Sequence, residues 1–182
     1  MAPPLARTSL EAHLYMGLHP CICGEDEFHP SSTVDLTDGV WVVHYEGICE
    51  SCGHPRAFQF RQPEEIVVPE DGQWAVGDQP SELLDAGEWR RVADLYGSGP
   101  ADGGRSKTDR DEAHGDLLAA AAALDEVLKF LPPGADVVPE SAFWTQVGRQ
   151  VRLAEPGRFW RVRLEAARDV YRRLAAEAGG SR

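Results

Sequence analysis

Asparagine is absent from this sequence of 182 residues, lysine occurs only at Lys107 and Lys129, and isoleucine occurs at three positions. Codons for these residues are AT-rich, whereas Ala, Arg, Gly and Pro are plentiful, so the composition predicts a high-GC bacterial source. No apolar run approaches the roughly 20 residues of a membrane-spanning helix, and the N-terminal residues lack the apolar core of a secretion signal. We therefore expect a cytoplasmic protein that does not cross a membrane.

Sequence motifs of the common enzyme classes are also missing. HExxH, GxSxG and GxGxxG do not occur. The stretch GGRSKT is similar to a phosphate-binding loop, but Ser106 stands where that loop requires glycine, and no buried strand precedes it. Single histidines lack a recognisable catalytic partner at His13, His29, His44 and His114. We therefore expect that the protein is not an enzyme.

The four cysteines form two close pairs, Cys21-Ile22-Cys23-Gly24 and Cys49-Glu50-Ser51-Cys52-Gly53. In a reducing cytoplasm, paired cysteines bind metal more often than they form disulfides. Zinc prefers four thiolate or imidazole ligands in a tetrahedron, and a chain supplies them as two pairs on tight turns. A glycine after each pair lets the turn fold back. The sequence therefore predicts Zn²⁺ bound by Cys21, Cys23, Cys49 and Cys52.

The region from Pro20 to Gln62 resembles the zinc-ribbon family on these two cysteine pairs. The resemblance implies two metal-binding turns, or knuckles, carried by antiparallel strands. A ribbon knuckle usually has two residues between its cysteines, and the first pair here has one. The adjacent His19 and His54 are alternative ligands, and either of them could replace a cysteine.

A structural role is expected for this metal. Four thiolates close the coordination shell, whereas a catalytic zinc keeps one open position. The four thiolates also donate so much charge that zinc becomes a poor Lewis acid. With all four cysteines bound to the metal, no cysteine is left to act as a thiol nucleophile. The acids Glu25, Asp26 and Glu50 lie near the cysteines in sequence, and we expect them to be solvated.

Residue patterns predict an α+β fold. Thr8 and Glu11 are spaced to cap a short helix. Three antiparallel strands are expected at STVDLT, at VWVVHYEGI after the Asp38–Gly39 turn, and at RAFQFR. Further helices are expected from Asp85 to about Tyr96, from about Asp109 to Leu131, from Pro139, and from Pro156.

The predicted organisation has three parts. Residues 1–96 form a zinc-ribbon-like β unit with flanking helices, residues 97–108 form a linker rich in Gly and Ser, and residues 109–182 form a helical region. The fold class is therefore α+β, with a three-stranded antiparallel sheet and a mostly helical C-terminal half.

The net charge of −12 is unevenly distributed. Residues 1–140 contain 26 Asp and Glu against 9 Lys and Arg, whereas residues 141–182 contain 4 acids against 9 arginines. An acidic body repels phosphate backbones, so nucleic-acid binding is not expected. It is complementary to the basic cleft of a nuclease or a similar target.

These features favour a non-enzymatic protein-binding module that a structural zinc stabilises and whose partner is a basic protein. Its most concrete form is an immunity protein that neutralises a toxin. The zinc-ribbon resemblance implies an alternative, an accessory factor of transcription or translation.

Two surface features have more than one interpretation. Arg161, Arg168 and Arg172 share one face of the last helix, where they can meet an acidic partner or nucleic acid, or complement acids of the same chain. Trp74 lies in the Gly- and Asp-rich stretch EDGQWAVGDQ. It is either a contact residue for a partner or docks on its own domain. In both cases we favour the interaction within the chain.

Overall fold

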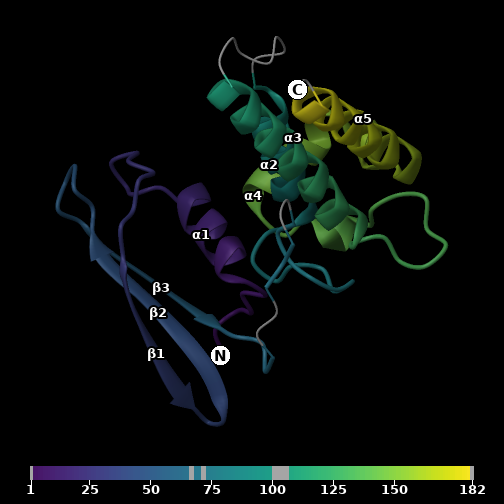
Figure 1. Cartoon of the computed structure of the whole chain (residues 1–182). Coiled ribbons are helices and arrows are strands. Elements are labelled where there is room, and N and C mark those ends of the chain that lie inside the picture. The colour runs from purple at the N-terminus through teal and green to yellow at the C-terminus, as the bar shows by residue number, and fades with distance from the viewer. Residues whose placement is uncertain (1, 66–67, 71–72, 100–106, 181–182) are drawn as a thin grey trace. The chain divides into compact units, whose positions relative to one another are not determined.

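The computed structural model in Figure 1 describes residues 2–65, 68–70, 73–99 and 107–180. The expected α+β fold is confirmed. The helices and strands, in chain order, are α1 (Ser9–Leu18), β1 (Ser31–Thr37), β2 (Val40–Ile48), β3 (Pro55–Arg61), α2 (Ala86–Gly97), α3 (Lys107–Leu128), the 3₁₀ turn Glu140–Ala142, α4 (Gln146–Ala154), the 3₁₀ turn Pro156–Phe159 and α5 (Arg161–Gly180).

The chain divides into two compact units. The β unit comprises Met1–Pro69 with Ser81–Leu83, and the helical unit comprises Glu70–Pro80 with Leu84–Arg182. Within the helical unit, α2 packs on α3. Of the linker expected at 97–108, residues 100–106 lie outside the described residues, so the expected domain boundaries stay a prediction.

The sheet of the β unit has the strand order β1-β2-β3, and both neighbouring pairs are antiparallel. Asp38 and Gly39 join the first two strands with φ angles of 51° and 80°. Two successive residues in the left-handed region match the right-handed twist of a hairpin, which is why an Asp-Gly pair is favoured there. The predicted hairpin is confirmed.

Helix α1 covers one face of this sheet (Figure 1). The Thr8 side chain accepts a hydrogen bond from the backbone N–H of Glu11 and caps the helix, as the sequence predicts. Tyr15 packs edge-on against Phe58 and Phe60 of β3, with ring centroids 6.3 and 5.6 Å apart. These aromatic contacts form the core between helix and sheet.

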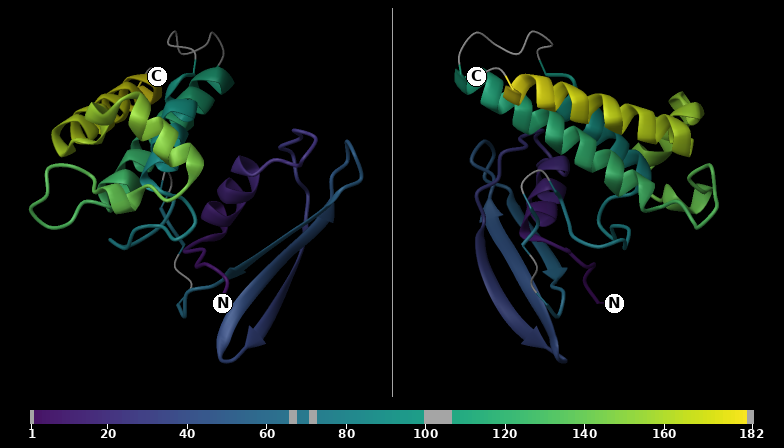
Figure 2. Two further views of the ribbon diagram at one scale, coloured as in Figure 1. Left: turned by 180° about the vertical axis from the view of Figure 1, so that it is seen from behind. Right: turned by 45° about the vertical axis from the view of Figure 1, so that its right-hand side comes forward.

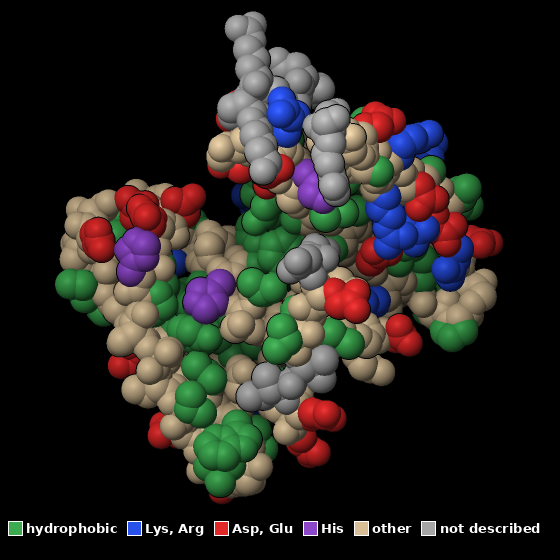
Figure 3. Space-filling model, in the orientation of Figure 1, with side chains coloured by type: hydrophobic (Ala, Val, Ile, Leu, Met, Phe, Trp, Pro, Cys, Tyr) green, Lys and Arg blue, Asp and Glu red, His purple; other side chains and the backbone are tan. Residues whose placement is uncertain are grey.

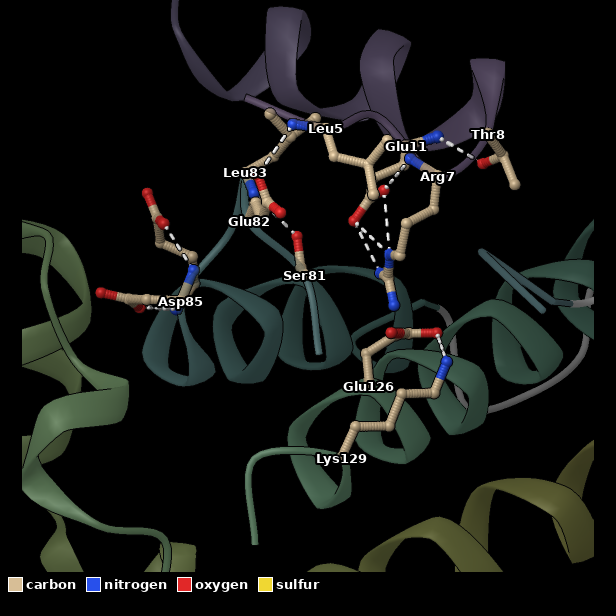
Figure 4. A network of polar contacts seen from close by, with 11 residues as sticks. Leu5, Arg7, Thr8, Glu11, Ser81, Glu82, Leu83, Asp85, Glu126 and Lys129 are labelled. Atoms are coloured by element: carbon tan, nitrogen blue, oxygen red, sulfur yellow. Dashed lines mark hydrogen bonds and ion pairs between the residues drawn. The ribbon is translucent and has the colours of Figure 1, made fainter. Parts of the chain in front are cut away.

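The N-terminal segment pairs with the last residue of β3, at one end of that edge of the sheet. Ala6 donates its backbone N–H to the carbonyl of Arg61, and Arg61 donates to the carbonyl of Pro4, both at 3.0 Å. Figure 4 shows Glu82 accepting a hydrogen bond from the backbone N–H of Leu5. Glu82 also forms an ion pair with Arg61.

In the helical unit, α3 and α5 lie side by side (Figure 2). The fully buried side chains of Trp89, Leu124, Val127 and Leu164 form much of its core. Trp74 donates its indole N–H to the Ala119 carbonyl, so it docks within its own unit, as favoured above. None of the helices in the described parts of the chain is long and apolar enough to cross a membrane.

The helix expected from Pro139 is divided in two. A 3₁₀ turn ends at Ala142, and α4 begins only at Gln146. Thr145 caps α4 by accepting the N–H of Gly148, while its own N–H and hydroxyl both donate to Asp85 at 2.8 Å. Because Asp85 also caps α2, one buried carboxylate sets the start of both helices.

The buried Glu88 on α2 is expected to make the stability of the protein depend on pH. Burial disfavours its carboxylate and raises its pKa from 4.5 to about 7. The stabilising neutral form is present at low pH and is lost as pH rises through 7. We expect the free energy of unfolding to fall by up to about 3 kcal/mol between pH 4.5 and 8.

Chemical denaturation across this pH range measures how steeply the free energy of unfolding falls with pH. Glu88→Gln should reduce this slope, whereas Glu140→Gln, at an exposed position, should leave it unchanged. An unchanged slope in Glu88→Gln would contradict the assignment.

Candidate metal centre

Each cysteine pair lies on a tight turn closed by backbone hydrogen bonds. The Cys21 carbonyl accepts from the Gly24 N–H, and the Cys49 carbonyl accepts from the Gly53 N–H, both at 2.8 Å. Both glycines have positive φ angles, 94° and 73°. A side chain at either position would strain the turn, which explains the glycine that ends each knuckle.

The turns bring the four sulfur atoms into one cluster. All four Sγ atoms lie within 4.8 Å of one another. The Cys21–Cys52 and Cys23–Cys49 Sγ distances are 3.5 and 3.6 Å. With Zn–S bonds of about 2.3 Å, tetrahedral geometry puts neighbouring sulfurs about 3.8 Å apart. The arrangement therefore fits a four-coordinate metal, and its identity as zinc stays a prediction.

Each knuckle contributes one buried and one exposed ligand. Cys21 and Cys49 are 5% and 1% exposed, whereas Cys23 and Cys52 face solvent. Cys49 follows directly after β2, so the sheet positions it. The cluster therefore lies at the protein surface, with two of its four cysteines buried. A metal there would join the loop before β1 to the β2–β3 turn.

The electrostatics of the cluster favour a cation. A hydrogen bond from the backbone N–H of Cys23 lowers the pKa of Cys21 to about 7. The pKa of Cys52 is raised to about 12, because the thiols of Cys23 and Cys21 outweigh the lowering by the His54 N–H. Four neighbouring thiols cannot all ionise beside one another. A divalent ion would compensate their charge and allow all four to bind as thiolates.

The two knuckles are also linked by side chains. The Ser51 hydroxyl of the second knuckle donates to Glu25, next to the first, at 2.5 Å. This hydrogen bond lowers the pKa of Glu25. Glu25 therefore has a structural partner, rather than being only solvated as expected from sequence.

Sequence reasoning missed Arg56, which holds the first knuckle in place. Its guanidinium is buried and donates to the carbonyls of Met16 and His19 at 3.0 and 2.7 Å, and it lies 4.2 Å from the centre of the Phe28 ring. The carbonyls at the end of α1 carry the negative end of the helix dipole, which stabilises a cation. No local pattern around Arg56 indicates these partners, since they lie about 40 residues earlier in the chain.

Neither proposed histidine belongs to the cluster. Within the described residues, the group consists of the four cysteines. The His19 ring stacks on Tyr15 with centroids 3.9 Å apart, and its Nδ1 lies 2.8 Å from the Tyr15 carbonyl oxygen. His54 contributes its carbonyl, which accepts the backbone N–H of Cys49.

The clustered cysteines and the small antiparallel sheet together fit a zinc-ribbon-like module. Comparison of the chain with protein-family models, curated proteins and solved structures finds no match. Only the geometry and the charge of the chain itself therefore indicate its function.

Proposed function

We propose that this chain is a non-enzymatic protein-binding module whose β unit is held together by a structural zinc ion, and that its partner is a basic protein. The most concrete form is an immunity protein that covers the basic surface of a toxin. Four cysteine ligands leave no open position for a substrate, which supports a structural metal.

The negative charge of the β unit is the main support for a basic partner. It contains eleven Asp and Glu against three arginines, a formal charge of −8. All three arginines have partners within the unit: Arg7 pairs with Glu11, Arg61 pairs with Glu82, and Arg56 donates to backbone carbonyls. The surface of this unit is therefore negative, and a basic partner would gain both faster encounter and correct orientation.

An accessory factor of transcription or translation is the alternative, and it needs a basic surface for nucleic acid. Figure 3 shows arginines and acids interleaved over α5. Arg168 and Arg172 both form ion pairs with Asp125 of α3, and Arg161 donates to the Ala135 carbonyl. Phosphate binding would have to compete with these interactions, which favours the protein partner.

Affinity capture from a lysate of the source organism tests the proposal. We expect the chain to retain a basic protein that the purified components bind one-to-one, with affinity that falls as salt rises. Neutralising Glu27, Asp35 and Glu46 together should weaken binding at least tenfold, because these exposed acids belong to the β unit.

The matched control neutralises Glu140, Glu155 and Asp169, three exposed acids of the helical unit, and should bind as the wild type does. A labelled DNA duplex is titrated in parallel. Tight, salt-sensitive duplex binding, or equal retention of protein by both triple variants and the wild type, would refute the proposal.

A further inference from the structure

Strand β1 is an open edge of the sheet. It pairs with β2 along seven consecutive residues, and within the described residues no other segment pairs with it. The opposite edge, β3, is bridged by Leu5 of the N-terminal segment only at its last residue, Arg61. In an antiparallel pair, alternate residues direct their N–H and C=O groups away from the partner. The outer side of β1 therefore offers about 24 Å of hydrogen-bonding edge.

Most of the usual protection of an exposed edge is missing from this strand, whose one charged residue is Asp35. Proteins block such edges with charged side chains, above all lysine, and with proline, a bulge or a covering segment. The sequence of β1, SSTVDLT, contains neither lysine nor proline, and its register with β2 is continuous. All seven residues are exposed. An edge left in this state is suited to strand addition, in which a partner segment extends the sheet.

One face of the sheet is apolar along β1. Val34 lies opposite Val43, and Leu36 lies opposite Trp41, so these side chains project from the same face of the sheet. Val34, Leu36 and Trp41 are 57%, 58% and 49% exposed. Val43 on the same face is buried, near the rings that α1 covers. The three exposed residues, which we call the apolar shelf, continue this core outward beside β1.

Figure 3 shows hydrophobic side chains gathered at the end of the β1–β2 hairpin. They belong to the β unit, whose charge is −8. A strand that covered the shelf would have to be apolar on that side and compatible with acids around it.

The other face of β1 carries one acid. Asp35 projects from it and lies 3.3 Å from His44 Nε2, and the exposed Glu46 follows on β2. A second copy of this chain would bring another β unit of the same charge to this edge, which Coulomb repulsion opposes. A basic segment would be attracted. The charge therefore favours a basic segment over a second copy of this chain as the strand that pairs with β1.

We propose that β1 binds an extended basic segment of the partner protein as a fourth strand, with apolar residues on the apolar shelf alternating with Lys or Arg beside Asp35. This inference rests on the proposed function, because it specifies how the basic partner is held. Alternation follows from the two-residue period of a strand, which sends neighbouring side chains to opposite faces.

The probe is a synthetic peptide of seven residues in which Val and Ile alternate with Lys and Arg, titrated into the full chain by calorimetry and by amide NMR. We expect saturable one-to-one binding and slower hydrogen exchange at alternate amides of β1. A peptide N-methylated at alternate residues cannot pair as a strand and should bind at least tenfold more weakly, although its charge is unchanged.

Leu36→Lys places a blocking charge on the shelf and should weaken peptide binding at least tenfold. Leu153→Lys adds the same charge at an exposed position of α4 and is the matched control. Absence of peptide binding, equal binding of the N-methylated peptide, equal loss in both variants, or a wild-type dimer that Leu36→Lys dissociates would each overturn the inference.

These outcomes separate the inference from the function on which it rests. If Leu36→Lys still retains the natural basic partner as tightly as the wild type does, strand addition is wrong while the protein-binding function stands. If the peptide binds at β1 but no basic protein is captured, the proposed function fails instead.

Discussion

Replacement of Cys49 by serine is expected to abolish metal binding and to unfold the β unit. Cys49 is 1% exposed and directly follows β2, so a change there reaches both the metal and the sheet. A structural zinc contributes about 10–16 kcal/mol of binding free energy, which is also folding free energy. Whole domains are stable by only about 5–15 kcal/mol. If the proposed zinc is bound, loss of one buried thiolate should therefore remove most of the free energy that stabilises a unit with so small a sheet.

Elemental analysis of protein purified without added metal gives the stoichiometry, with about one zinc per chain expected for the wild type. NMR of the strand amides reports unfolding. Ser51→Ala is the control in the same knuckle: it removes only the hydrogen bond to Glu25, should keep its zinc, and should lose about 1 kcal/mol. A Cys49→Ser protein that stays folded without metal would show that the cluster is not a structural site.

Alanine in place of Gly148 is expected to destabilise the helical unit by about 3–5 kcal/mol. A Cβ added at Gly148 would overlap the Asp85 carboxylate, and one added at Gly87 would overlap the backbone of Gly148. Asp85 cannot move aside, because it is fully buried and accepts hydrogen bonds from Gly87, Glu88 and Thr145. The two glycines thus allow α2 and α4 to approach closely.

Gly115→Ala is the matched control, since it makes the same change inside helix α3, where an added Cβ meets nothing within 4 Å. It should stabilise the protein by about 0.5–1 kcal/mol, because alanine loses less backbone entropy than glycine on forming a helix. Urea denaturation of both variants measures the two changes in the free energy of unfolding, which should have opposite signs. A Gly148→Ala protein as stable as the wild type would contradict the close packing of α2 on α4.

Features that depend on neighbouring residues were predictable from the sequence. The Asp38–Gly39 hairpin and the Thr8 cap of α1 are found where their motifs indicate, and α2 begins directly after Asp85, where the sequence predicts its start. Each depends on hydrogen bonds or backbone angles within about four residues, so a short stretch of sequence contains the whole cause. The tight turn at each cysteine pair was predictable for the same reason, because the glycine that closes it stands directly after the pair.

Features that join distant parts of the chain were decided only by the tertiary structure. The break before α4 depends on Asp85, 60 residues before Thr145, and a sequence pattern around Pro139 does not contain that partner. Arg56 is likewise held by carbonyls about 40 residues away. Which cysteines are buried and which edge of the sheet stays open also depend on how other segments cover them. Burial is a property of packing, and local sequence determines only which residues can tolerate it.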